Sequence, residues 1–301
     1  MPRIKLEYIW VDGTSFFPVL RSRIKILSSI MSNNIIERAD DDAIGLYPPD
    51  LLSYVPSWAF NNSGVESSLK PVKIFKDPFN NELGFIVLCE TQDFRMNPGK
   101  LNTRRGAKKV FIKCEDDNPK CKISQMYKVD TPKIESFRKE HLELCILAGL
   151  GITDMSYVRW HPKFTTFSIG LETQNPIDVA DEILIARWIL KKLAAKRNTK
   201  IWYLSKDVKL DKSRETRCHI SFSTRLTRGL SGICMIESLL KNFGPSLPIG
   251  DYTKQIFISN DTNRGVSGEF EYRDLEPNHD PYKTVTNLMN KICLNKGDLD
   301  D

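Results

Sequence analysis

The sequence predicts an α+β fold, with strands in the first hundred residues and helices mixed with strands from about residue 130 onward. Three observations support this class. Residues 4–11, 22–27 and 81–91 carry the apolar patterns of strands. Residues 178–197 carry the clearest helical period of the chain. No Gly-rich phosphate loop or dinucleotide fingerprint points to a doubly wound sheet.

Each element of the first half follows from local pattern. "IKLEYIWV" (4–11) is a strand ended by the turn signal Asp12-Gly13, and "SRIKIL" (22–27) alternates as a second strand. "NELGFIVLCET" (81–91) is an apolar run typical of a buried strand, and the polar segments 47–64 and 76–82 are expected to be loops. The basic segment "TRRGAKK" (103–109) is interpreted as the solvated start of a strand that continues into the apolar residues 110–112.

In the second half, Thr131-Pro132 begins a helix that Gly149 can close. Residues 164–170 return to strand character, and a long helix follows, with acids near its start and bases near its end. Residues 201–204 and 218–223 are predicted strands and residues 231–242 a helix. Asp280-Pro281 caps the last predicted helix.

Composition excludes several classes. The 301 residues carry a mild net charge of +6, and the basic segment lacks interleaved aromatics, so no nucleic-acid partner is expected. No apolar run is long enough to span a bilayer, and the N-terminus lacks a secretory pattern, so no membrane partner is expected either. Seven scattered cysteines without a CxxC pair indicate a reducing, cytoplasmic setting.

The stretch "TRCHISFSTR" (216–225) contains the first candidate site residue. It alternates as a half-buried strand, which places His219 on the face opposite the apolar Cys218, Ile220 and Phe222. A lone strand histidine is more often a hydrogen-bonded structural residue than a metal ligand. The alternation alone leaves both roles open.

Segments along the whole chain resemble the glutamine synthetase family, eukaryotic type. "EYIWVDGTSFFPVLRSR" (7–23) is similar to its opening EYIW-[IV]-DGT hairpin, and "VPSWAFNNSG" (55–64) to its P-x-W-x-F-D-G-S-S loop. "KPVKIFKDPF" (70–79), "VLCET" (87–91) and "LNTRRGAKK" (101–109) match further N-terminal motifs in order. In the second half "ILIARWIL" (183–190), "CHISFST" (218–224) and "GEFEYRDLEPNHDPY" (268–282) resemble segments of its catalytic domain.

The resemblance implies a fold and an activity. It implies an N-terminal β-grasp domain (1–100) followed by a glutamine-synthetase-type α+β catalytic domain (101–301), degenerate and with deletions. The family is a glutamate–ammonia ligase of nitrogen metabolism, which phosphorylates glutamate with ATP and displaces the phosphate with ammonia. Its cofactors are Mg²⁺ or Mn²⁺, because the triphosphate, glutamate and the transferred phosphoryl group are all anionic.

The resemblance also assigns roles to four residues that are retained. His219 stands at a metal-ligand position of the CH-x-[NS]-FS strand, and Glu271 in "EFEYR" stands at another. Arg273 matches an arginine that contacts substrate or phosphate, and Ser223 a serine near the nucleotide. Two ligands fall short of the six or so donors that one Mg²⁺ needs, so the pair is interpreted as vestigial.

Other positions of the family's site are replaced. In "PKCKISQMY" (119–127), Ser124 and Met126 stand where the E-x-E strand supplies two metal glutamates. In "VRWHPKFTTF" (158–167), Arg159 and Thr166 stand in place of two further glutamates. A thioether does not bind Mg²⁺ usefully, and an arginine repels a cation.

Further departures concern the base and the loops. The aspartate that helps deprotonate ammonium is replaced by Asn61, which is no proton acceptor at neutral pH, so no catalytic base is expected. "KLDKSRETR" (209–217) replaces the glycine-rich glutamate-binding loop, and the chain between Leu240 and Glu271 is too short for the family's lid. Glu115, Asp116 and Asp117 are the nearby carboxylates that could substitute for the lost metal ligands in an active enzyme, but they are interpreted as a solvated turn.

These observations leave two main hypotheses and a weaker third. The first is a pseudoenzyme with a binding or assembly role, either as a homo-oligomer or in hetero-assembly with an active glutamine synthetase. The alternative is an active, divergent glutamine synthetase that binds ATP and metal with another ligand set. The third is a decayed gene product without a selected role. Whether the chain is an enzyme is open at this stage.

Overall fold

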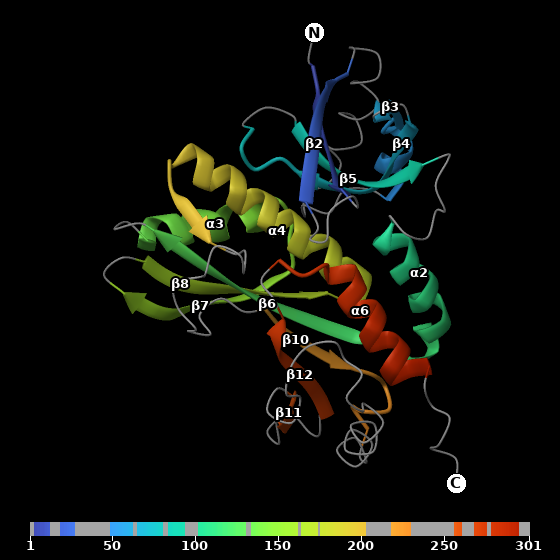
Figure 1. Cartoon of the computed structure of the whole chain (residues 1–301), viewed down its shortest axis with the longest axis vertical. Coiled ribbons are helices and arrows are strands. Elements are labelled where there is room, and N and C mark those ends of the chain that lie inside the picture. Colours follow the sequence, from blue (N-terminus) through green and yellow to red (C-terminus); the bar gives the residue numbers. More distant parts are fainter. Residues whose placement is uncertain are drawn as a thin grey trace. The chain divides into compact units, whose positions relative to one another are not determined.

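The chain forms two compact units, one of residues 1–105 with 140–150 and one of residues 106–139 with 151–301. The expected division at residue 100 stays a prediction. The computed structural model (Figure 1) describes residues 3–12, 19–27, 49–62, 65–80, 84–93, 102–130, 134–161, 164–173, 175–202, 218–229, 256–260, 268–275 and 278–294.

The first unit contains a five-stranded sheet in the order β2-β1-β5-β4-β3. β1 pairs parallel with β5, and the other neighbours are antiparallel. The strands predicted at 4–11 and 22–27 are confirmed, and so is the strand predicted at 81–91 over its described residues 84–91. The loop predicted at 47–64 is wrong in part. It holds the short helix η1 (Pro49–Tyr54) and strand β3. The strand bounds are β1 Lys5–Asp12, β2 Val19–Ile26, β3 Trp58–Asn62, β4 Val65–Lys76 and β5 Gly84–Asp93.

The core of the first unit follows from alternation along β1. Ile4, Leu6 and Tyr8 are fully buried and pack with Phe85 and Val87 of the parallel strand β5. The Tyr8 hydroxyl donates a hydrogen bond of 2.7 Å to the carbonyl of Pro56. The buried ring therefore keeps its polar end satisfied.

The second unit contains a seven-stranded sheet whose main order is β11-β12-β10-β6-β8-β7, with β9 paired to β6. All of its pairs are antiparallel. The predicted strands at 164–170 and 218–223 are confirmed. The bounds are β6 Lys120–Asp130, β7 Ile152–His161, β8 Phe164–Thr173, β9 Lys200–Trp202, β10 Cys218–Ser223, β11 Ile256–Asn260 and β12 Gly268–Leu275.

Helix α4 (Pro176–Lys196) covers one face of this sheet, where it packs against β6 and β8. Arg187 of α4 donates hydrogen bonds of 3.1 and 2.7 Å to Gln125 Oε1 on β6, and both residues are buried. Because strand side chains alternate, the residues of β6 next to Gln125 belong to the opposite face. The face away from α4 therefore holds Ser124 and Met126, which are half-buried.

Four α-helices lie within the described residues: α2 (Thr103–Cys114), α3 (Ile134–Leu147), α4 and α6 (Pro281–Met289), with the short helices η2 (Glu115–Asp117) and η6 (Asn290–Leu294) following α2 and α6. With its two sheets, the structure is mixed α+β, as predicted. No helix of the described part is long and apolar enough to cross a membrane. The helix predicted at 231–242 lies outside the described residues.

Helix α2 corrects the interpretation of residues 103–109 as the start of a strand. Ala107 and Cys114 are buried and Val110 and Phe111 half-buried, a helical spacing, whereas Ile112 is 60% exposed. Asn102 begins the helix, since its Oδ1 accepts a 2.9 Å hydrogen bond from the Arg105 amide. The apolar run 110–112 suggested a buried strand, but only two of its three residues face inward.

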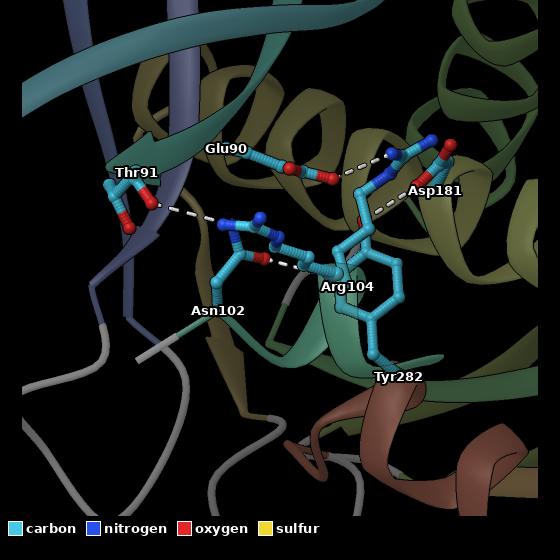
Figure 2. Close-up of polar contacts among 7 residues, drawn as sticks. Glu90, Thr91, Asn102, Arg104, Asp181 and Tyr282 are labelled. Carbon is cyan, nitrogen blue, oxygen red and sulfur yellow. Dashed lines mark hydrogen bonds and ion pairs between the residues drawn. The ribbon is translucent and has the colours of Figure 1, made fainter. Parts of the chain in front are cut away.

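Two sets of polar contacts, one in each unit, are drawn in Figure 2. In the first unit, Arg104 Nη1 lies 2.9 Å from Glu90 Oε1, and Asn102 Nδ2 donates to the Thr91 carbonyl at 3.3 Å. In the second unit, the Tyr282 hydroxyl donates to Asp181 Oδ1 at 2.6 Å. The first set ties the start of α2 to β5, and the second ties α6 to α4.

Candidate functional site

The predicted ligand positions of the second unit share one face of its sheet. Residues directly opposite in antiparallel strands lie on the same face, and so do residues two apart in one strand. His219 of β10 pairs with Ser124 of β6, and Met126 is two residues further along β6. Glu271 of β12 pairs with Ser221, which is two residues from His219. The register thus brings together residues that are far apart in the sequence.

His219 and Glu271 contact each other directly. His219 Nδ1 lies 3.5 Å from Glu271 Oε1, with about a fifth of each side chain exposed. The two groups form an ion pair when the imidazole is protonated. Cys218, Ile220 and Phe222 are buried on the other face, so the alternation predicted for this strand is confirmed.

Arg159 and Thr166 are opposite each other in the hairpin of β7 and β8, and Thr166 is also opposite Lys128 of β6. Lys128 is two residues beyond Met126. The register positions of Arg159 and Thr166 are therefore on the same face as Ser124, at the level of Lys128 along β6.

The sequence reasoning missed an ion pair on this face. Lys122 Nζ lies 2.9 Å from Asp154 Oδ2, with side chains about one third and two fifths exposed. Asp154 is opposite Gly170, which is opposite Ser124. A Cβ on Gly170 would collide with the Asp154 carboxylate, so that carboxylate lies over the glycine. The sequence offered one signal for this ion pair, which is that Lys122 is two residues before Ser124 and so shares its face. Asp154 could be placed on the face only once the strand order was known.

Arg273 stands at a β-bulge beside His219. Ile220 pairs with Tyr272 and Cys218 with Leu275, so Arg273 and Asp274 together oppose the single residue His219. The register thus brings Arg273 next to the pair of His219 and Glu271, while its predicted role in binding substrate or phosphate stays a prediction.

Ser223 has its hydroxyl engaged within the protein. Its Oγ accepts a 2.9 Å hydrogen bond from Arg228 Nη1, and Arg228 Nη2 donates to the Asn118 carbonyl at 2.8 Å. Ser223 is 6% exposed. Its nucleotide contact stays a prediction, and a ligand there would have to share the hydroxyl with Arg228.

The remaining candidates lie elsewhere. Asn61 belongs to β3 of the first unit, opposite Glu66 of β4. The run 115–117 forms η2, with Glu115 and Asp116 exposed. Asp117 is only 9% exposed, which corrects its interpretation as part of a solvated turn.

Burial also sets the chemistry of the cysteine next to His219. Desolvation raises the pKa of the Cys218 thiol to about 12, although the nearby charge of Arg187 lowers it in part. The thiolate, which is the form that reacts and binds metals, is therefore disfavoured at neutral pH. Cys218 is thus a core residue and adds no ligand to the face that carries His219.

The donor set on this face does not fit the family's Mg²⁺ or Mn²⁺. Hard cations require about six oxygen-rich donors. Here one imidazole and one carboxylate have a serine, a methionine and a lysine as neighbours, and the lysine is already paired with Asp154. Within the residues described, no three His, Cys, Asp or Glu side chains meet as a metal site. We therefore derive no reaction step through a metal.

The chain is similar to known glutamine synthetases. No protein-family model matches it. A viral protein of Acanthamoeba polyphaga mimivirus, provisionally named a glutamine synthetase, is 27% identical over 96% of this chain and 94% of its own length. The glutamine synthetase of Streptomyces viridochromogenes is 25% identical over 96% of each chain, and that of Agaricus bisporus 22% identical over 98% and 94%.

These alignments also bear on the deletions. The first two run over 353 positions, more than the 301 residues of this chain, so part of the relatives' length has no counterpart here. The similarity nevertheless extends across nearly the whole chain, in agreement with the motifs and the mixed α+β structure. The chain is similar over nearly its whole length to glutamine synthetases, at an identity of 22–27%.

Proposed function

We propose that this chain is a glutamine-synthetase-like pseudoenzyme, whose fold serves binding or assembly rather than glutamine synthesis. One observation carries the proposal. The sheet face that holds His219 and Glu271 has neutral or basic residues at the register positions where the resemblance implies glutamates: Ser124, Met126, Arg159 and Thr166.

The missing carboxylates matter because the reaction gathers anions. ATP, glutamate and the transferred phosphoryl group repel one another unless cations screen them. Losing one such electrostatic contribution costs on the order of 2–4 kcal/mol of transition-state stabilisation. The costs of losing several residues that act as a unit are not additive. With Asn61 in place of the base, proton removal from ammonium loses its acceptor as well.

The test is glutamine formation from glutamate, ammonium and ATP with Mg²⁺ or Mn²⁺. The parent chain is compared with a His219→Ala, Glu271→Ala double variant. We expect the same background rate from both. Metal-dependent formation by the parent that the double variant abolishes would overturn the proposal and establish the alternative, an active divergent enzyme. The 3.5 Å approach of His219 to Glu271 is the observation that favours this alternative.

A restored variant checks the physical reason. Ser124→Glu with Met126→Glu would place two carboxylates on the face beside His219 and Glu271. We expect Mn²⁺ to stabilise this variant against unfolding and to leave the parent unchanged, because a cation that binds only the folded state adds RT ln(1 + [L]/Kd). Equal stabilisation of both proteins would mean that the existing residues already bind the metal.

The assembly role is tested by light scattering of the protein alone and mixed with an active glutamine synthetase. A homo-oligomer or a mixed assembly supports the role. Monomers in both samples would contradict it, and the proposal would then have to rest on the binding of another partner.

A further inference from the structure

Helix α2 presents a face made almost entirely of cations. Arg105, Lys108, Lys109 and Lys113 are exposed and follow the spacing of one side of a helix. Ala107 and Cys114 are buried on the other side of α2. The Cys114 thiol lies 3.9 Å from the carbonyl of Met289, the last residue of α6. We call these four residues the α2 basic face. Residues 106–114 of α2 belong to the second unit, where they run beside α6 (Figure 1).

Helix stability accounts for only one of these four cations, Lys113, which lies in the last turn, where the helix dipole favours positive charge. The first turn of α2 has no acid, although the helix dipole favours acids there. Like charges three and four residues apart repel one another, as Arg105 and Lys109 or Lys109 and Lys113 do. Within the described part of the chain, none of the four cations forms an ion pair, whereas Arg104 pairs with Glu90. The α2 basic face therefore keeps an unfavourable arrangement that an external anion would relieve.

We propose that the α2 basic face binds the phosphate backbone of nucleic acid. The face extends over about 12 Å of helix, at about 1.5 Å per residue, and a duplex carries one charge per about 1.7 Å of its axis. An array of phosphates thus offers each cation a partner without requiring any base contact. Three features of the sequence argued against nucleic acid: a mild net charge, a basic segment without interleaved aromatics, and the start of a strand at residues 103–109. Helix α2 removes the third reason, and contacts to phosphates alone need neither aromatics nor a large net charge.

Two other anionic surfaces fit less well. A helix that lies in a membrane needs an exposed apolar face, but Val110 and Phe111 are half-buried, and Ile112 is the one exposed large apolar residue of α2. An acidic protein is a poorer match because lysine is depleted in protein–protein interfaces, and three of the four cations are lysines.

The test compares two triple variants that remove the same charge. Lys108→Gln, Lys109→Gln, Lys113→Gln neutralises the α2 basic face, and Lys191→Gln, Lys196→Gln, Lys200→Gln neutralises three exposed lysines around the end of α4. Glutamine is as good a helix former as lysine, so both variants should fold. Binding to a labelled duplex is followed by fluorescence anisotropy between about 50 and 200 mM salt.

We expect the parent and the α4 variant to bind with a log–log salt slope of about −3.6, from about 0.9 for each phosphate that one of the four cations neutralises. The α2 variant should bind at least about tenfold more weakly at the lowest salt and with a flatter slope. Equal weakening of both variants would show a mere net-charge effect and overturn the proposal, as would absence of binding by the parent. Loss of binding by the α2 variant to phosphatidylserine vesicles, without duplex binding by the parent, would assign the face to membranes instead.

Discussion

At the scale of single residues, Gly149 shows how a local rule fixes a helix end. The residue has φ 81°, in the left-handed region. Its amide donates to the Ile146 carbonyl at 2.9 Å, and the Leu150 amide donates to the Cys145 carbonyl at 3.1 Å. This pair of bonds is the Schellman closure of α3, which requires a residue that tolerates positive φ.

The variant Gly149→Ala is expected to lower the free energy of unfolding by about 1–2 kcal/mol, because a Cβ disfavours the left-handed conformation. Urea denaturation measures this change. Gly106→Ala is the matched control, since Gly106 lies inside α2 and a Cβ there would have no heavy atom within 4 Å. The control should gain about 0.5–1 kcal/mol, because alanine favours the helix. A gain in both variants would show that Gly149 needs no special conformation.

At the scale of elements, α6 is fixed at its start. The Asp280 side chain accepts hydrogen bonds from the amides of Tyr282 at 2.9 Å and Lys283 at 3.3 Å, so the predicted cap is confirmed. The Tyr282 hydroxyl then reaches Asp181 of α4, and both residues are buried. The first contact follows from sequence, whereas the second joins residues 101 positions apart and needs the fold.

Tyr282→Phe is expected to cost about 1.5–3 kcal/mol of unfolding free energy, because a hydrogen bond to a buried carboxylate is lost while the ring stays. Tyr8→Phe serves as the comparison, since the Tyr8 hydroxyl donates to the neutral carbonyl of Pro56. That change should cost about 0.5–1.5 kcal/mol. Urea denaturation measures both costs. If Tyr282→Phe costs no more than Tyr8→Phe, the Tyr282 hydroxyl does not donate to a charged Asp181.

At the scale of the whole molecule, buried thiols in both units couple folding to alkaline pH. The six cysteines among the described residues are buried and form no disulfide with one another. Burial raises the pKa of the thiols of Cys89 and Cys145, and it raises that of Cys218 to about 12 from an ordinary 9.0. A raised folded-state pKa stabilises the folded chain below the unfolded pKa, and this stability is lost as pH rises towards the folded value.

We therefore expect these thiols to leave the free energy of unfolding unchanged up to about pH 9 and to lower it above that pH. Each such thiol contributes a slope of about 1.4 kcal/mol per pH unit, up to its folded pKa. Urea titrations at a series of pH values measure the slope. Cys218→Ala should reduce it by one thiol's share, whatever its packing cost at neutral pH. An unchanged slope in that variant would show that Cys218 does not ionise on unfolding.

The sequence by itself determined the elements whose signals are local. Strand alternation at 218–223, the cap at Asp280 and the closure at Gly149 depend on residues close together in the chain, so their pattern is visible without the fold. The motifs similarly indicated the family across the chain. The basic run 103–109 was wrongly predicted to start a strand because apolar residues follow it. Only the burial pattern of those apolar residues in the structure distinguished a helix from a strand.

Only the tertiary structure decided which side chains meet. The order β12-β10-β6-β8-β7 places Glu271, His219, Ser124, Gly170 and Asp154 side by side, although they span more than a hundred residues of sequence. The pairing of Lys122 with Asp154 and the buried bond from Tyr282 to Asp181 belong to the same class. Such contacts depend on strand order and helix packing, which arise from the burial of apolar surface across the whole unit rather than from any local pattern.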